Sequence, residues 1–241
     1  NQKVLQSDKI YVRNKNNQER LDRLYERYHI QCYQNKEKVI GEADIIILSM
    51  KPYDLKDAVQ SLKALIKPNQ LIISVVAGIS TDYISNLIET NNPVIRAMPN
   101  TSISKGEYAT DHHVKITEEL FNTIGITVVI EEDDMHTVTA ISGSGPAYVY
   151  FMVEALEKAA MESGLDQTIA KALITQTIIG AGEMLRQSGE SAETLRKKVT
   201  SPAGTTEAGL NALAKHDFQH ALVECVKSAH DRSMELGKRN E

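Results

Sequence analysis

The stretch Asp44-Ile-Ile-Ile-Leu-Ser-Met-Lys-Pro52 begins with a nearly continuous apolar run and ends at a proline. A short run without polar alternation is typical of a strand that helices cover on both faces, as in a parallel sheet. Further β-branched runs occur at 10–12, 30–33, 70–76 and 93–97. Helical patterns lie between them at 17–28, 36–41 (capped by Asn35), 53–66 and 80–89. Strands that alternate with helices predict a doubly wound α/β domain.

The second half of the chain has a different character, because strand patterns stop after about Glu131. Long helical periodicities replace them at 137–141, 147–163, 168–188, 192–199, 206–215 and 218–236. Helices with wide apolar faces and short connections form bundles, and often subunit interfaces. We therefore predict two domains, an α/β domain over 1–132 and an all-α domain over 133–241.

Composition excludes several classes of protein. The 241 residues carry 27 basic and 32 acidic side chains, a formal charge of −5, which disfavours a nucleic-acid partner. The longest apolar runs are far shorter than the roughly 20 residues that span a bilayer, so we expect no membrane partner. Cys32 and Cys225 have neither disulfide-framework nor zinc-site spacing. These features predict a cytoplasmic protein without a metal.

Ligands of an open α/β sheet bind at the carboxyl ends of its strands. After the first predicted strand come Arg13, Asn14 and Lys15, where an NAD-selective fold would place a carboxylate. Cationic and amide donors there suit a ribose 2′-phosphate and favour NADPH, with NADH still possible. A solvated turn explains the same three residues equally well.

The next two strand ends carry residues suited to the same ligand. Ser49 and Met50 precede Lys51 and Pro52; the proline ends the strand, and the lysine either meets ribose or phosphate or is an ordinary surface lysine. Ala77-Gly78 offers small residues where a ring can lie close to the backbone. The Gly-rich turn that binds pyrophosphate is absent. We expect it to precede Asn1, in which case the domain is N-terminally incomplete; a complete chain would argue against dinucleotide binding.

Three further segments have more specific patterns: Arg96-Ala-Met-Pro-Asn-Thr101, Ser142-Gly-Ser-Gly-Pro-Ala-Tyr148 and Val199-Thr-Ser-Pro-Ala-Gly-Thr-Thr206. The last enters a helix, whose first-turn amides can hold a carboxylate without a basic side chain. Thr205 and Thr206 would add hydroxyl donors, and Gly204 would let a ligand approach. An ordinary helix cap is the alternative for this segment. The segment with Pro146 is a helix junction.

Taken in order with Lys51-Pro52 and Val76-Ala-Gly78, these segments resemble the motifs of the pyrroline-5-carboxylate reductase family over nearly the whole chain. The resemblance implies a Rossmann-like α/β dinucleotide-binding domain followed by an all-α dimerisation and substrate domain. It also implies reduction of 1-pyrroline-5-carboxylate to L-proline, the last step of proline biosynthesis, by a homodimer or larger homo-oligomer.

The resemblance also implies roles for single residues. The substrate carboxylate would meet the loop of Ser201, Gly204, Thr205 and Thr206, and the Thr206 hydroxyl would face the ring nitrogen as the catalytic group. The residues that would bind the cofactor are Arg13, Asn14, Lys15, Asn35, Ser49, Met50, Lys51, Pro52, Ala77, Gly78, Pro99 and Asn100. Hydride addition to a C=N bond depends mainly on positioning, so we expect no triad, metal or perturbed histidine. We interpret Glu107, Asp111 and the cluster 131–134 as solvated.

Two departures leave alternatives open. Ala203 stands where the family has glycine, and it would be strained if its φ were positive. The stretch 106–117 is short, as if residues were missing or the sheet had lost a strand. An inactive or weakly active, regulatory relative is the first alternative, supported by Ala203 and by the absent Gly-rich turn. A two-domain hydroxy-acid dehydrogenase is the second, although neither Lys158 nor Lys171 lies in a recognisable version of its catalytic motif.

Overall fold

The computed structural model describes residues 5–99 and 101–240, with side chains described as far as Lys238. The chain forms two compact units. A sheet unit contains the chain up to Gly143 together with the part from Ala229 onward, and a helical unit contains Ser144–Ser228. Met135 and Ala140, which follow the predicted 132/133 boundary, are buried in the sheet unit.

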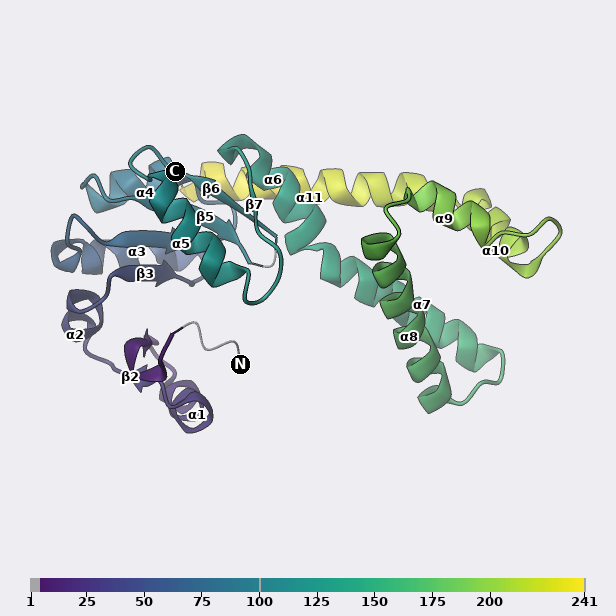
Figure 1. Cartoon of the computed structure of the whole chain (residues 1–241), viewed down its shortest axis with the longest axis horizontal. Coiled ribbons are helices and arrows are strands. Elements are labelled where there is room, and N and C mark those ends of the chain that lie inside the picture. Colours follow the sequence, from purple (N-terminus) through teal and green to yellow (C-terminus); the bar gives the residue numbers. More distant parts are fainter. Residues whose placement is uncertain (1–4, 100, 241) are drawn as a thin grey trace. The chain divides into compact units, whose positions relative to one another are not determined.

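Two sheets make up the core of the sheet unit (Figure 1). The larger has the order β3-β4-β5-β6-β7, formed by Ile45–Leu48, Leu71–Ser74, Val94–Met98, Ser102–Lys105 and Val128–Val129. Its pairs are parallel except β5 with β6, which is antiparallel. The smaller sheet pairs β1 (Tyr11–Val12) with β2 (Gln31–Cys32) in parallel.

Helices connect these strands and begin where capping side chains allow. The α-helices of the sheet unit are α1 (Gln18–Tyr28), α2 (Lys36–Gly41), α3 (Pro52–Leu62), α4 (Thr81–Ile88), α5 (Asp111–Phe121) and α6 (Met135–Val138). Short 3-10 turns lie at Ser7–Lys9, Lys63–Leu65 and Glu132–Asp134, and a π-helical turn at Thr139–Gly143. Asn35 caps α2 and Ser80 caps α4, each accepting a hydrogen bond from an amide of the first helical turn. The Asn35 cap confirms the sequence prediction.

Apolar side chains alternate between the two faces of the larger sheet, which gives three layers. On one face Leu48 and Ile72 pack with Leu55 of α3 and Ile84 of α4. On the other face Ile73 packs in a cluster that includes residues of α5. The α/β fold class predicted from the sequence is confirmed by this arrangement.

Two details differ from the predictions. The segments β6, α5 and β7 were not predicted, and α5 occupies part of the stretch that the sequence suggested was short. Ile47 was expected to be covered but is 51% exposed, because β3 is the end strand of the sheet and pairs with β4 alone.

The helical unit contains α7 (Gly145–Glu162), α8 (Gln167–Gln187), α9 (Ala192–Lys198), α10 (Thr205–Lys215) and the first part of α11 (Phe218–Asn240). Within it, α7 packs against α8. Of the residues described between 144 and 228, only Ala170 is buried. Among the helices that the structure describes, none combines the length and the apolar character needed to cross a membrane.

Candidate functional site

Three of the predicted cofactor loops lie at one edge of the larger sheet, whereas Arg13, Asn14, Lys15 and Asn35 follow the strands of the smaller sheet. Leu48 is in register with Ser74, and Ser74 with Arg96, so β3, β4 and β5 end side by side. Ser49–Pro52, Ala77-Gly78 and Pro99 therefore leave the same sheet edge. Asn100 lies outside the described residues. Ligands of parallel sheets bind at such edges.

The loop after β3 leads directly into a helix N-terminus. Lys51 is the N-cap of α3, with φ −71° and ψ 149°, and Pro52 occupies the first turn. The Lys51 side chain is exposed, and it makes no capping hydrogen bond. Its ammonium and the positive end of the α3 dipole therefore lie at the same edge of the sheet, which suits an anionic ligand. Ser49 is exposed and Met50 is half-buried against the core.

The loop after β4 has a small exposed front and a buried back. Ala77 is exposed, whereas Gly78 is buried with φ +75°. A Cβ atom built on Gly78 would lie 3.0 Å from Cβ of Leu236 and 3.1 Å from the carbonyl oxygen of Ser233. The Ala77 methyl group is thus the one side chain of this residue pair that projects from the exposed side of the loop. These residues fit a flat aromatic ring such as nicotinamide at this strand end.

The end of β1 carries two exposed cations, Arg13 and Lys15. Arg13 Nε donates to the carbonyl oxygen of Gln34 at 3.1 Å, which orients the guanidinium. Among the described residues, neither cation forms an ion pair. The side-chain oxygen of Asn14 accepts from two turn amides and that of Asn35 from the Lys38 amide at 2.9 Å. The side-chain oxygens of both asparagines therefore bind nearby backbone amides. Their side-chain amide nitrogens are the donors that a ligand can use.

Arg96 of β5 forms an ion pair with Glu132 that was not predicted from the sequence. Arg96 is 2% exposed, and its Nη1 donates to Oε1 of Glu132 at 2.8 Å. The Ser104 hydroxyl donates to the other oxygen of the same carboxylate. The interpretation of 131–134 as solvated is therefore wrong for Glu132. The available signal was the arginine itself, because a charge inside an apolar strand needs a counter-charge.

The segment 135–143 also contacts the loops of the site. Ser142 Oγ donates to the Thr101 hydroxyl at 2.8 Å. A Cβ on Gly143 would meet the Met98 sulfur at 2.9 Å. His136 Nδ1 lies 2.9 Å from the Ser233 hydroxyl of α11. The start of the junction motif, Ser142 and Gly143, thus lies at the end of β5.

The predicted carboxylate loop lies in the helical unit. Gly204 is the N-cap of α10 and supplies no capping side chain, while Thr205 and Thr206 are exposed. The Gly204 amide already donates to the Ser201 carbonyl at 3.1 Å, so the amides that follow are the better donors for an anion. Ala203 has φ +56°, so the condition under which strain was expected at this residue is met. Its amide donates to Oε2 of Glu207 at 2.8 Å.

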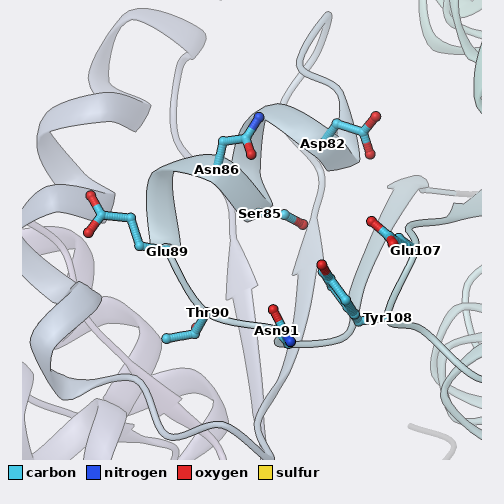
Figure 2. Close-up of a pocket in the computed structure, with 8 residues that line it drawn as sticks. All are labelled: Asp82, Ser85, Asn86, Glu89, Thr90, Asn91, Glu107 and Tyr108. Carbon is cyan, nitrogen blue, oxygen red and sulfur yellow. The ribbon is translucent and has the colours of Figure 1, made fainter.

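A different region of the sheet unit forms a cavity of about 450 Å³ (Figure 2). Its walls are α4, the loop that follows α4, and the turn after β6. The lining residues are Asp82, Ser85, Asn86, Glu89, Thr90, Asn91, Glu107 and Tyr108. None of them belongs to the strand-end loops. Three carboxylates would repel phosphate groups and a carboxylate substrate, so we do not place the dinucleotide in this cavity.

His113, a residue with a shifted pKa, lies in α5 and not in the strand-end loops. Burial lowers the pKa of His113, with a smaller contribution from His112. We expected no perturbed histidine, so that prediction is wrong for His113, whose role is structural: its Nδ1 accepts from the Thr110 amide at the start of α5. Burial raises the pKa of Tyr148 in α7. The described residues contain no cluster of His, Cys, Asp and Glu that would hold a metal ion.

Comparison with known proteins gives consistent results for the two halves of the chain. Residues 132–236 match the family model described as pyrroline-5-carboxylate reductase dimerisation. Residues 1–78 match a model described as NADP oxidoreductase, coenzyme F420-dependent.

Relatives match nearly the whole chain. Pyrroline-5-carboxylate reductase 2 of Bacillus subtilis is 43% identical over 97% of this chain and 87% of its own length. The reductase of Staphylococcus haemolyticus is 38% identical over 99% of this chain and 91% of its own. A solved reductase from Plasmodium falciparum with NADP bound has a TM-score of 0.88 and 26% identity, covering 97% of this chain and 89% of that one. The Coxiella burnetii enzyme has a TM-score of 0.86 and 28% identity, covering 96% and 89%.

Proposed function

The chain belongs to the pyrroline-5-carboxylate reductase family, and from this premise we propose that it reduces 1-pyrroline-5-carboxylate to L-proline. The observation that supports the assignment most strongly is the 43% identity to a named reductase over 97% of the chain. The α10 N-terminus, with Thr205 and Thr206 exposed beside a glycine cap, adds a site of the required chemistry. The relatives described above are all named as reductases, so they lend no support to an inactive, regulatory protein.

The strand-end loops would hold the dinucleotide. When bound, a reduced nicotinamide supplies the hydride that adds to the carbon of the protonated C=N bond, and the nitrogen becomes the secondary amine of proline. Ala77 and Gly78 would support the nicotinamide, with Pro99 and Asn100 beside it. Lys51 and Asn35 would contact ribose. These residues would contribute position rather than acid-base chemistry.

The first turn of α10 would bind the substrate. The Thr205 and Thr206 amides would hold its carboxylate at the positive end of the helix dipole. The Ser201 carbonyl already occupies the Gly204 amide, so Ser201 and Gly204 would mainly shape the loop. The Thr206 hydroxyl would face the ring nitrogen and orient the C=N bond.

We propose that the active protein is a homodimer or a larger assembly of this chain. The helical unit leaves large apolar side chains exposed, including Phe151 at 77%, Ile179 at 58% and Leu173 at 56%. Covering one such side chain stabilises an assembly by about 1.5–3 kcal/mol. A second copy of the same helices would provide that cover.

NADPH is the proposed cofactor, with NADH as the weaker alternative. Arg13 and Lys15 are exposed at the end of β1 without an ion-pair partner among the described residues. A 2′-phosphate would give their charges a partner. The cytoplasmic location and the 132/133 domain boundary stay predictions from the sequence.

The test is turnover of 1-pyrroline-5-carboxylate, followed by NADPH and NADH absorbance, in wild-type protein and in Thr206→Val and Thr206→Ser variants. Valine keeps the shape and removes the hydroxyl, whereas serine keeps the hydroxyl. We expect valine to lower kcat by about 10- to 100-fold and serine to recover most of it. Absence of wild-type turnover with both cofactors would refute the proposed reaction, and equal activity of valine and serine would refute the role of Thr206.

A further inference from the structure

The last turns of α11 touch the Ala77-Gly78 loop through two glycines. A Cβ atom on Gly237 would lie 2.7 Å from the carbonyl oxygen of Gly78, closer than side chains tolerate. A Cβ on Gly78 would in turn lie 3.3 Å from the Gly237 amide nitrogen. Both glycines are buried. The helix and the loop therefore meet backbone to backbone, and a methyl group on either side would separate them.

A second contact holds α11 in this position. Ser233 lies one turn before Gly237 and is 5% exposed. Its hydroxyl forms a hydrogen bond of 2.9 Å with His136 Nδ1 of α6. The same α6 segment leads to Ser142 and Gly143, which contact the end of β5. The end of β4 is thus contacted by α11, and the end of β5 by the segment that follows α6.

We propose that the Gly237 turn of α11 is a positioning element for the cofactor, because it fixes the backbone of the Ala77-Gly78 loop from the side opposite the nicotinamide. The inference rests on the proposed function, in which this loop supports the ring. Gly237 acts only through Gly78, and Ser233 acts by holding the helix against α6. Neither residue is a catalytic residue.

The geometry limits how far the loop can move. Val76 and Ile79 are buried on either side of the exposed Ala77, so the loop is anchored in the core at both ends. An added methyl at Gly237 would displace the Gly78 carbonyl, because its Cβ atom would lie 2.7 Å from the carbonyl oxygen. Hydride transfer is sensitive to such shifts, since a displacement of about 1 Å can lower a rate about 100-fold. Overall dinucleotide affinity depends on several other loops and should change less.

The decisive variant is Gly237→Ala, with Gly41→Ala as the matched control. Both glycines lie in helices of the sheet unit, where alanine is normally the better helix former. A Cβ on Gly41 would meet nothing within 4 Å. Ser233→Ala is a second, milder variant that removes the hydrogen bond to His136 without adding an atom. Circular dichroism and thermal melts establish that each full-length variant is folded.

Three quantities are measured: kcat, the Kd for NADPH by calorimetry, and hydrogen exchange of the amides at 75–79 without cofactor. For Gly237→Ala we expect kcat to fall about 10-fold, the Kd to change less than about threefold, and exchange at 75–79 to accelerate. Ser233→Ala should change in the same direction by less. Gly41→Ala should match wild type.

Equal exchange and equal kcat in Gly237→Ala and Gly41→Ala would overturn the inference. A large loss of NADPH affinity with unchanged kcat would also overturn it, because the contact would then serve binding rather than position. Failure of the proposed function has a different signature, since wild-type protein would then turn over no substrate. In that case exchange at 75–79 still decides whether Gly237 holds the loop.

Discussion

Replacing Ala203 by glycine should stabilise the protein, because Ala203 has φ +56°. The left-handed conformation costs an ordinary residue about 1–2 kcal/mol. Glycine avoids that cost but loses about 0.4–1 kcal/mol through the greater freedom of the unfolded chain. The difference is a net stabilisation of about 0.5–1 kcal/mol. Urea unfolding at a fixed protein concentration measures it, since an oligomer's stability depends on concentration.

The same change should raise activity. Ala203 directly precedes the α10 cap, and its amide donates to Glu207 at 2.8 Å, so strain at this residue affects the loop that we propose binds the substrate carboxylate. If relief of the strain favours the substrate-bound loop over the free loop by about 0.4–1 kcal/mol, kcat/KM for pyrroline-5-carboxylate should rise about two- to fivefold. Steady-state kinetics with saturating NADPH measures this ratio.

Gly204→Ala is the matched control at the neighbouring position. Gly204 has φ −86°, so its backbone conformation does not require glycine. A Cβ there would lie 3.0 Å from the Ser201 carbonyl oxygen and would also contact the Ser201 hydroxyl. We expect this variant to be less stable and less active than wild type. The strain argument is refuted if Ala203→Gly is neutral or destabilising, or if Gly204→Ala shows the same gains.

Three other perturbations test separate parts of the structure. Glu207→Gln keeps the acceptor for the Ala203 amide but removes a negative charge beside the proposed carboxylate site, so the KM for the imino acid should fall about two- to fivefold; an unchanged KM would place the substrate elsewhere. Glu132→Ala leaves the Arg96 guanidinium buried without its partner and should lower the free energy of unfolding by about 3 kcal/mol. Asp111→Ala removes an exposed pair with Lys105 and should lower it by less than about 1 kcal/mol. Similar losses in the two variants would contradict this account. The His113 pKa is lowered in the folded protein, so its contribution to stability is complete above the unfolded value near 6.5 and is lost as pH falls through the lower folded value. His113→Gln, which keeps a capping side chain, should weaken the dependence of the melting temperature on pH below about pH 6.5; a pH dependence identical to that of wild type would refute this account.

Local signals in the sequence predicted the elements that they control. Asn35 and Ser80 start their helices because their side chains accept amide hydrogen bonds, a property that each carries in any context. Pro52 begins α3 for a similar reason, since proline lacks the amide that the first turn leaves unpaired. At Ala203 the sequence raised the question of a positive φ, because glycine is usual there, and the structure answers it with φ +56°.

Elements stabilised by non-local pairing were missed. Strand β6 has one apolar residue, Ile103, in the cluster beneath α5, and it is a strand because it pairs antiparallel with β5. Strand β7 is two residues long and depends on β6 in the same way. Likewise, no local pattern relates Glu132 to Arg96, because the pair forms only when the segment after β7 packs behind β5. The periodicity of a sequence indicates which face of a helix or strand is buried, but it does not indicate which other element pairs with it.

Gly78 shows how the structure adds a physical reason for a residue that the sequence singled out. The sequence suggested glycine there so that a ring could lie close to the backbone, and the positive φ gives a local reason for the same residue. The packing of Gly237 against its carbonyl supplies a further reason, on the opposite side of the loop. In isolation Gly237 is only a weak point in a long helix. The contact between the α11 backbone and the Ala77-Gly78 loop explains why glycine stands at 237, since neither Gly78 nor Gly237 can be replaced without moving the other.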